Sequence, residues 1–88
     1  MSTTVQLLEA ALQRLAPEHL DIQDDSALHA GHAGARDGGG HYTLTIVSAS
    51  FANLSRVQRH RLVYQTLGEL MTGRVHALAI RALTPEEL

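Results

Sequence analysis

Residues 26–40 interrupt the regular patterns of this chain. The stretch has no hydrophobic periodicity and holds five of the seven glycines, between Gly31 and Gly40. The chain has 88 residues, so the residues outside this segment are enough for only one modest core. We expect that core to have one sheet layer against one helix layer. Long irregular segments in small domains are functional or disordered. We therefore expect a single domain over residues 1–88, with a long loop inserted in it.

The part before this stretch predicts one helix and one strand. Residues 3–16 carry apolar side chains at helical spacing, and Pro17 follows as a stop signal. Thr3 and Gln6 have the spacing of a capping box at the helix start. Residues 19–25 alternate between apolar and polar side chains, which indicates a short strand. The apolar stripe of the helix comprises Val5, Leu8, Leu12 and Leu15.

The part after it predicts a strand, a helix and a final strand. Residues 41–48 are rich in β-formers, and residues 75–83 alternate in the same way. Between them, Ser55 is placed to cap a helix that runs to about Met71, with an extra helical turn at residues 52–55. The helix face expected to be buried comprises Val57, His60, Val63, Tyr64, Leu67 and Met71.

The first of these two strands should bury one face only. The side chains expected to face the core are Tyr42, Leu44 and Ile46, and those expected on the other face are Thr43, Thr45 and Val47. The preceding strand and this one form a hairpin with an oversized tip. The resulting element order is α-β-β-α-β.

The composition excludes several kinds of site. The chain has no cysteine, so it has no disulfide, no thiol nucleophile and no thiolate metal site of its own. It has no lysine, which rules out the usual phosphate-binding glycine motif, and it shows no strand–serine–helix elbow. We therefore assign no catalytic residues and expect a protein that is not an enzyme.

The N-terminus predicts no targeting segment. It has neither a basic n-region nor a long apolar run, and no stretch approaches membrane-spanning length. We expect a cytoplasmic protein without a membrane partner.

Positive charge is concentrated in the second half of the chain. Residues 55–81 contain five arginines and a single acid, Glu69, although the net charge of the whole chain is −2. Three of them, Arg56, Arg59 and Arg61, lie on the predicted helix. They fit either contacts to nucleic-acid phosphates or an ordinary solvated helix face.

Histidine is the residue type most able to bind a metal or a proton here, and the 88 residues include six of them. His29 and His32 lie in the glycine-rich loop, and His76 opens the last strand. Neutral imidazole is the commonest protein ligand for borderline metals, so these three are candidates; solvated loop histidines are the alternative. His60, on the apolar helix face, is expected to be a half-buried structural residue. The two remaining histidines, His19 and His41, border strands and suggest no role.

Four segments of the chain resemble one known family. They are H-Y-T-L-T-I-V-S-A-S-F from His41, V-Q-R-H-R-L-V-Y, V-H-A-L-A-I and T-P-E-E. At this spacing they closely resemble the BolA family, over about residues 3–87 and most strongly from His41 onward. The resemblance implies an α+β fold of order α-β-β-α-β, with a three-stranded sheet covered by helices on one face, similar to a class II KH domain.

The resemblance also implies a metal-binding function. In that family, the histidine of the V-H-A-L segment and a loop residue bind metal, which here implies His76 and His32, with His29 as an extra candidate. Family members pair with monothiol glutaredoxins and share a [2Fe–2S] cluster, whose other ligands are the partner's cysteine and glutathione. The isolated chain is thus expected to hold no cofactor. Two imidazoles can replace two thiolates on one iron, and a partner must then supply the sulfur ligands.

The family is also associated with DNA binding and transcriptional regulation. This alternative would use Arg56, Arg59 and Arg61 as tentative nucleic-acid contacts. The chain lacks the G-x-x-G loop of KH domains; the corresponding turn reads F-A-N-L-S. Low positive charge and the lack of an aromatic stacking platform favour the cluster-binding function over this one, so we expect only weak, salt-sensitive DNA binding.

Overall fold

The computed structural model describes residues 3–25 and 40–88. Three strands and three α-helices make up this part of the chain, with short 3-10 turns at Gln13–Leu15, Ala49–Phe51 and Pro85–Glu87. The helices and strands are α1 (Thr3–Leu12), β1 (His19–Asp24), β2 (Gly40–Val47), α2 (Arg56–Leu67), α3 (Leu70–Gly73) and β3 (Val75–Leu83). The predicted α+β class and the order α-β-β-α-β are confirmed, and α3 is an addition.

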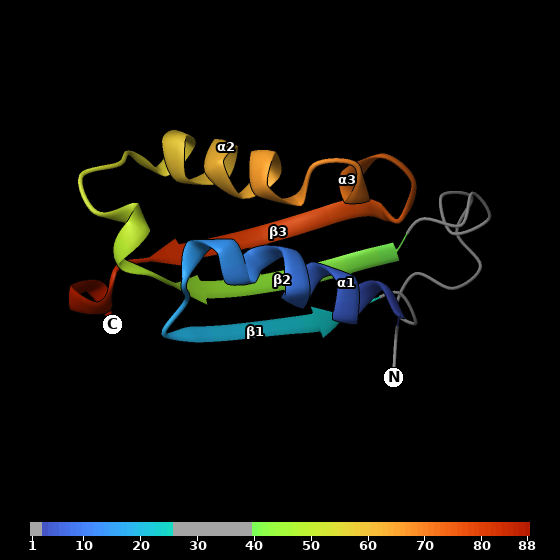
Figure 1. Cartoon of the computed structure of the whole chain (residues 1–88), viewed down its shortest axis with the longest axis horizontal. Coiled ribbons are helices and arrows are strands. Elements are labelled where there is room, and N and C mark those ends of the chain that lie inside the picture. Colours follow the sequence, from blue (N-terminus) through green and yellow to red (C-terminus); the bar gives the residue numbers. More distant parts are fainter. Residues whose placement is uncertain (1–2, 26–39) are drawn as a thin grey trace.

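The three strands form one sheet in the order β1-β2-β3. β1 and β2 are antiparallel, from His19 opposite Val47 to Asp24 opposite Tyr42, which confirms the predicted hairpin. β2 and β3 are parallel, so both begin at the same end of the sheet. Figure 1 shows that β1 ends there too, so the end of β1 and the first residues of β2 and β3 lie at one end of the sheet.

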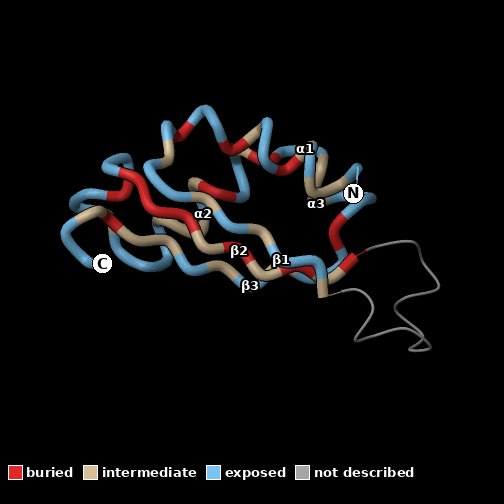
Figure 2. The backbone as a smooth tube through the Cα atoms, turned by 90° about the horizontal axis from the view of Figure 1, so that it is seen from below, coloured by how far each residue is buried: buried red, intermediate tan, exposed pale blue. Residues whose placement is uncertain are grey.

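The core lies between the sheet and the helices. α1 lies in front of the sheet in Figure 1, and α2 runs beside β3. Seen from below, in Figure 2, α1 and α3 lie on the same side of the sheet. The alternating burial of β2 gives this core a row of inward side chains. The buried core residues are Leu8, Leu12, Leu15, Tyr42, Leu44, Ile46, Phe51, Val63, Leu67 and Val75.

The N-terminal helix follows the predicted stripe. Leu8, Leu12 and Leu15 are buried, and Val5 packs against them in part. The helix tightens into a 3-10 turn over its last residues, and Ala16 then adopts a left-handed conformation with φ of 47°. The Ala16 N–H donates to the carbonyl of Gln13. This hydrogen bond satisfies that carbonyl where the chain leaves the helix, just before Pro17.

α2 begins as predicted and ends earlier than predicted. Ser55 caps it: the Ser55 hydroxyl accepts from the Gln58 N–H, and the Gln58 side chain accepts from the Ser55 N–H. The helix stops at Leu67 because Gly68 takes φ of 55° and ψ of −126°, and a separate turn, α3, follows. The prediction of one continuous helix to Met71 is therefore wrong.

The predicted inward face of α2 is also partly wrong. Val57 is 60% exposed and Tyr64 is 42% exposed, whereas Val63 and Leu67 are buried as expected. The helix is rotated so that Arg59 lies one turn before Val63 on the inward side, since its guanidinium bonds to backbone oxygens there. A long side chain with an apolar stem can occupy such a position, but a hydrophobic pattern does not reveal it.

The strands agree closely with their predictions. β3 has the expected bounds, and β2 buries Tyr42, Leu44 and Ile46. Val47, which was expected on the outer face, is fully buried at the last position of β2, between its partners His19 and Leu83. The extra turn predicted at residues 52–55 lies earlier, at Ala49–Phe51, where the Ser48 hydroxyl accepts from the Ser50 N–H. The likeness to a KH domain stays a prediction.

Candidate functional site

Segment 26–39 joins the sheet at Asp25 and Gly40, and both attachment points are held by backbone hydrogen bonds. The Asp25 N–H donates to the His41 carbonyl at 2.7 Å, and the Gly40 N–H donates to the Arg74 carbonyl at 3.0 Å. Asp25, Gly40, His41, Val75 and His76 together are called the histidine end of the sheet. The fold therefore fixes Asp25 and Gly40, the two residues that flank the segment, near the start of β3.

An irregularity in strand pairing sets the position of His76. Gly40 pairs with Val75, but the next residue of β2, His41, pairs with Ala77, so His76 has no counterpart in the ladder. The alternation of burial breaks at the same place: Val75 is buried, and His76 and Ala77 are both exposed. A bulge of this kind redirects one side chain out of the regular pleat. Here it leaves the imidazole of His76 exposed.

A second imidazole lies beside His76. The ring centroids of His41 and His76 are 5.2 Å apart, and the two ring planes are inclined by 46°. His41 is partly buried near the start of β2. Sequence reasoning gave His41 no role, although one signal was available. Both histidines are near the starts of predicted strands, and parallel neighbours would bring these starts together.

Gly40 is needed at this end of the sheet because an aromatic ring covers its α-carbon. A methyl group added there would collide with the ring of Tyr42, whose side chain is buried in the core. The ring cannot swing away without opening the core, so the glycine is a packing requirement. The strand next to the candidate ligands is thus held in place from its first residue.

The other two predicted metal ligands, His29 and His32, lie outside the described residues. Among residues 3–25 and 40–88, no cluster of three or more histidine, cysteine or acidic side chains is arranged to hold a metal ion. The described part of the chain thus contributes two neighbouring imidazoles and no third ligand. The assignment of His32 and His29 stays a prediction.

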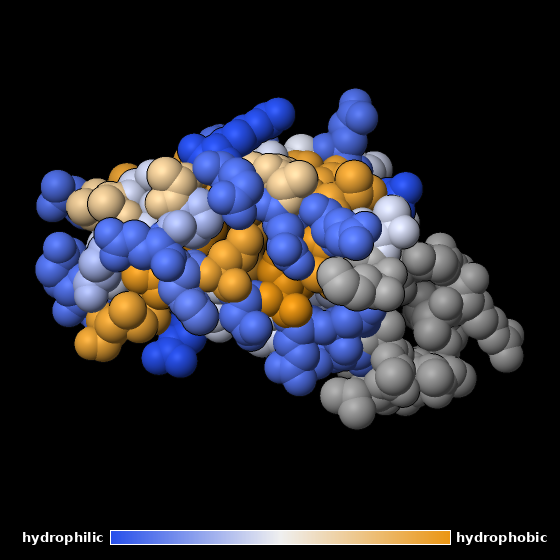
Figure 3. Space-filling model, turned by 60° about the horizontal axis from the view of Figure 1, so that its bottom comes forward, coloured by the Kyte–Doolittle hydropathy of each residue, from blue (hydrophilic) through white to orange (hydrophobic). Residues whose placement is uncertain are grey.

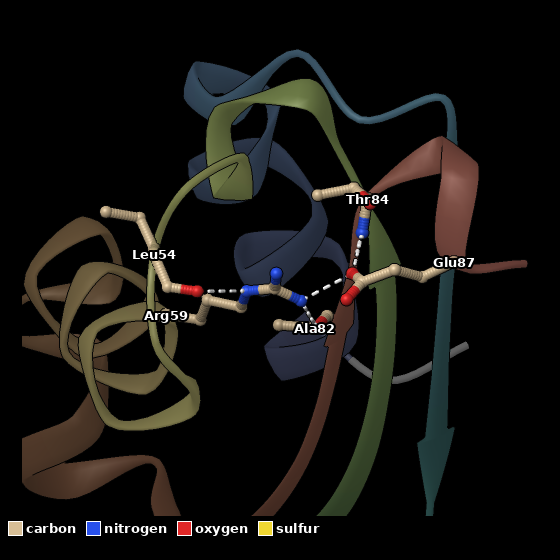
Figure 4. Close-up of polar contacts among 5 residues, drawn as sticks. All are labelled: Leu54, Arg59, Ala82, Thr84 and Glu87. Atoms are coloured by element: carbon tan, nitrogen blue, oxygen red, sulfur yellow. Dashed lines mark hydrogen bonds and ion pairs between the residues drawn. The ribbon is translucent and has the colours of Figure 1, made fainter.

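The three arginines proposed as nucleic-acid contacts differ in their surroundings. Arg56 and Arg61 are exposed on α2. Arg59 is partly buried: its Nε donates to the Leu54 carbonyl at 3.0 Å, and its Nη1 donates to the Ala82 carbonyl at 3.0 Å. In Figure 4 its guanidinium points into the protein, toward the end of β3. The structure thus uses Arg59 internally and leaves the other two open to solvent.

Glu87 completes this internal network. Its Oε1 accepts from Arg59 Nη1 at 2.6 Å and from the Thr84 N–H at 2.6 Å (Figure 4). The side-chain hydrogen bond from Arg59, with the backbone hydrogen bond from Thr84, lowers the pKa of Glu87 to about 2. The carboxylate connects the C-terminal turn to α2, at the end of the sheet opposite to the histidine end.

The other two histidines of the described part of the chain, His60 and His19, lie elsewhere in the fold. His60 is partly buried on α2, as expected for a structural residue. His19 is exposed at the first position of β1, opposite Val47 and thus at the far end of the sheet from His76. His19 therefore offers a matched comparison for any role assigned to the histidine end.

The hollow between the helices and the sheet is apolar. It is bordered by aliphatic side chains alone, which give a bound molecule no polar group to orient it. Its lining residues are Leu8, Leu12, Ile22, Leu44, Leu67 and Leu78. Figure 3 shows apolar side chains in the middle of the face it presents, surrounded by hydrophilic ones. This hollow belongs to the core and has no features of an active site.

Among the described residues, none of the helices has the length and apolarity needed to cross a membrane.

Comparison with known proteins identifies the family. The model of the BolA family, described as BolA-like protein, matches residues 12–87. BolA-like protein 1 of Mus musculus is 44% identical over 75 residues, which cover 85% of this chain and 53% of that protein. The DNA-binding transcriptional regulator BolA of Haemophilus influenzae is 40% identical over 83 residues, which cover 93% of this chain and 78% of that protein. The chain thus spans about half the length of the mouse relative and most of the bacterial one.

Solved structures agree with these similarities. The BolA domain of SufE1 from Arabidopsis thaliana has a TM-score of 0.86 and 36% identity, with 100% of this chain and 99% of that one covered. The solution structure of BolA1 from Mus musculus has a TM-score of 0.81 and 39% identity, with 99% of this chain and 69% of that one covered. The family model covers most of the chain, the relatives share 40–44% of its residues and the solved structures share its fold, so the chain belongs to the BolA family.

Proposed function

We propose that this chain is a non-enzymatic partner of a monothiol glutaredoxin, with which it co-ligates a [2Fe–2S] cluster for iron–sulfur cluster assembly, trafficking or iron regulation. His76 is the central ligand of this chain, and His32 or His29 is the second. The partner's cysteine and glutathione supply the sulfur ligands. The cluster is cargo shared by the pair, and the isolated chain holds none.

The observation that carries the proposal is the exposure of His76 at a strand bulge, at the edge of the sheet to which segment 26–39 is attached. An exposed imidazole at a sheet edge can reach a metal centre held mainly by another protein. The absence of cysteine fits this division of ligands, because this chain can offer imidazole but no thiolate donors. The donor set therefore suits a site completed by a partner.

The comparisons are compatible with a role other than catalysis. Relatives carry the names of BolA-like proteins and of a transcriptional regulator, and one is named a SufE-like protein of chloroplasts and mitochondria. This chain covers 25% of that SufE-like protein, so the activity of the longer protein is not transferred to it. A cytoplasmic location stays a prediction, because relatives differ in compartment.

The test is reconstitution of the mixed complex. The purified chain is combined with a monothiol glutaredoxin, iron, sulfide and glutathione. We expect a heterodimer whose visible circular dichroism spectrum differs from that of the glutaredoxin homodimer. His76→Ala should abolish that spectrum, and His19→Ala, at the other end of the sheet, should preserve it. If the spectrum remains that of the glutaredoxin homodimer, or survives His76→Ala, the proposal is wrong.

A second candidate function is DNA binding, which the name of the Haemophilus influenzae relative favours. Here the exposed Arg56 and Arg61 would contact phosphates, whereas Arg59 is already bonded within the protein. With two such contacts, the salt dependence of binding should be shallow, at roughly 0.9 log units in affinity per contact for each log unit of salt.

This alternative is tested by fluorescence anisotropy with duplex DNA at several salt concentrations. We expect weak binding that Arg56→Gln and Arg61→Gln reduce further. Tight, sequence-specific binding at physiological salt would make DNA regulation the principal function.

A further inference from the structure

We propose that the uncovered face of the sheet is a self-association surface, on which two copies of this chain pack face to face with Asp21 of each copy opposite Arg81 of the other. The uncovered face is the side of the sheet formed by Asp21, Gln23, Thr43, Thr45, Ala79 and Arg81. The proposal goes beyond the proposed function and uses none of its metal ligands.

The core occupies only one face of the sheet. Tyr42, Leu44 and Ile46 of β2 point into it, and the side chains of β1 and β3 that pack against them alternate in the same phase. All three α-helices contribute side chains to this core, and Figure 2 shows α1 and α3 on that side of the sheet. Among the described residues, no α-helix therefore covers the opposite face.

The side chains on the uncovered face are accessible to another molecule. Those on the two outer strands, Asp21, Gln23, Ala79 and Arg81, are exposed, and those on the central strand, Thr43 and Thr45, are partly buried. The face thus has short side chains along its centre and its charged groups at its sides.

One row across this face has opposite charges at its two ends. Asp21 of β1 is paired with Thr45 of β2, and Thr45 is paired with Arg81 of β3. The α-carbons of Asp21 and Arg81 are thus two strand spacings apart, which is about 10 Å. With the residues that the structure describes, neither side chain forms an ion pair or a hydrogen bond. Both charges are therefore placed to interact with a second molecule.

These charges select one way of packing two copies. Most homodimers have two-fold symmetry, and sheets that pack face to face lie about 10 Å apart with their strands within about 30° of each other. A two-fold axis parallel to β2 places β1 of one copy over β3 of the other, so each Asp21 faces the Arg81 of the second copy. An axis across the strands would instead place Asp21 over Asp21 and Arg81 over Arg81, which repulsion between like charges disfavours.

The next row fits the same axis in size and in hydrogen bonding. Gln23 is paired with Thr43, and Thr43 is paired with Ala79. The axis therefore places the long side chain of Gln23 over the small Ala79 of the second copy. The Thr43 hydroxyl already donates to the Asp25 carboxylate at 2.6 Å, so covering it leaves no unpaired donor.

The dimer should be weak. A face only three strands wide buries less area than a standard interface, and exposed ion pairs fix orientation more than they add affinity. We expect a dissociation constant on the order of 0.1–1 mM. Because Asp21 and Arg81 are exposed, added salt should weaken the association.

The experiment is sedimentation equilibrium of the full chain, up to millimolar concentration, at low and at physiological salt. We expect a monomer–dimer equilibrium. Asp21→Arg alone and Arg81→Asp alone each create two like-charge contacts and should weaken dimerisation at least tenfold. The double variant Asp21→Arg/Arg81→Asp restores both contacts and should recover the wild-type constant.

Two control variants separate the contact from the effect of net charge. Glu9→Arg and Arg14→Asp carry the same net charges as the two single variants, but the changes lie at exposed positions on the helical side. Both should dimerise as the wild type does. Circular dichroism checks that each variant is folded, and Asp21→Asn and Arg81→Gln replace a charge reversal that unfolds the chain.

Mixing the two single variants tests whether the contact joins different copies. An equimolar mixture of Asp21→Arg and Arg81→Asp chains should form a heterodimer, because both contacts then join unlike charges. The proposal is wrong if the wild type stays monomeric, if the single variants dimerise as well as the controls, or if the mixture does not associate. The samples contain no iron and no glutaredoxin, so these outcomes are independent of the proposed cluster function.

Discussion

The two ends of the sheet use their polar side chains differently. At the C-terminal end, made up of Ser48, Leu83, Thr84 and Glu87, polar side chains are bonded within the protein. The buried Ser48 hydroxyl donates to the Leu15 carbonyl, and Glu87 bonds both Arg59 and the Thr84 N–H. At the histidine end, the imidazole of His76 is exposed beside His41. Polar contacts between segments distant in the sequence thus lie at one end of the sheet, and the candidate ligands lie at the other.

This difference predicts that stability and the proposed binding are separable in this molecule. The residues that join α1, α2 and the C-terminal turn lie at the other end of the sheet from the imidazoles. Mutations at distant sites with no shared partners usually have additive effects on the free energy of unfolding. The candidate site can therefore change without unfolding the protein. Four substitutions test how complete the separation is, and they are ordered by the size of their expected effect.

The largest effect is expected from Phe51→Ala at the C-terminal end. Phe51 is fully buried beyond the last residue of β2, so truncating it leaves a cavity. We expect the free energy of unfolding to fall by about 3–5 kcal/mol, measured by urea denaturation. Val57→Ala, at an exposed position of α2, should change it by less than about 0.5 kcal/mol. Similar losses in the two variants would contradict the burial pattern.

Gly40→Ala examines whether the histidine end is wholly free of structural constraint. The new methyl group would collide with the buried ring of Tyr42, and we expect a loss of about 1–3 kcal/mol in the free energy of unfolding. Gly73→Ala is the control, because nothing beyond its chain neighbours and its own helix backbone lies within 4 Å of the added methyl group. Equal stability of the two variants would show that the Tyr42 ring can move aside.

Glu87→Gln tests the C-terminal network through its pH dependence. The pKa of Glu87 is lowered from 4.5 to about 2, so its charged form stabilises the native state above pH 4.5, and this contribution is lost as pH falls toward 2. We expect Glu87→Gln to lower Tm at neutral pH and the gap from the wild type to close on acidification. Glu86→Gln should follow the wild type. A gap that is constant with pH would exclude the ionised carboxylate as the cause.

The smallest change in stability is expected from His76→Ala. Its side chain is exposed and fills no part of the core, so the free energy of unfolding should change by less than about 0.5 kcal/mol. Thermal and urea denaturation of the purified variant measure this. A loss above about 1 kcal/mol would mean that the contact with His41 supports the fold, and the two ends would then be less different than proposed.

Much of the fold was predictable because its elements carry strong local signals. The bounds of β3 follow from strict alternation, and the start of α2 follows from Ser55. The inward face of α2 was not predictable from apolar spacing. A charged residue, Arg59, occupies an inward position there because backbone carbonyls of Leu54 and Ala82 are available to its guanidinium.

The candidate site was predictable only in part. The choice of His76 as a candidate ligand followed from its residue type and its place at the start of a strand, but the neighbouring imidazole of His41 was not predicted. Their approach depends on parallel pairing of β2 with β3 and on a one-residue register shift. Neither leaves a mark in the periodicity of a single strand, since both arise from contacts between segments distant in sequence.

The two backbone hydrogen bonds at the attachment points of segment 26–39 have a consequence for how proteins of this kind diversify. Asp25 is bonded to His41, and Gly40 is bonded to Arg74, so both residues that flank the segment are held by the sheet itself. Doubling the length of an insertion at such a point costs only about 0.6 kcal/mol in closure entropy. An exchange of this segment for one of different length and donor atoms would therefore leave the sheet register unchanged. We therefore expect that replacing this segment can give the chain new metal-ligating side chains while the fold stays the same.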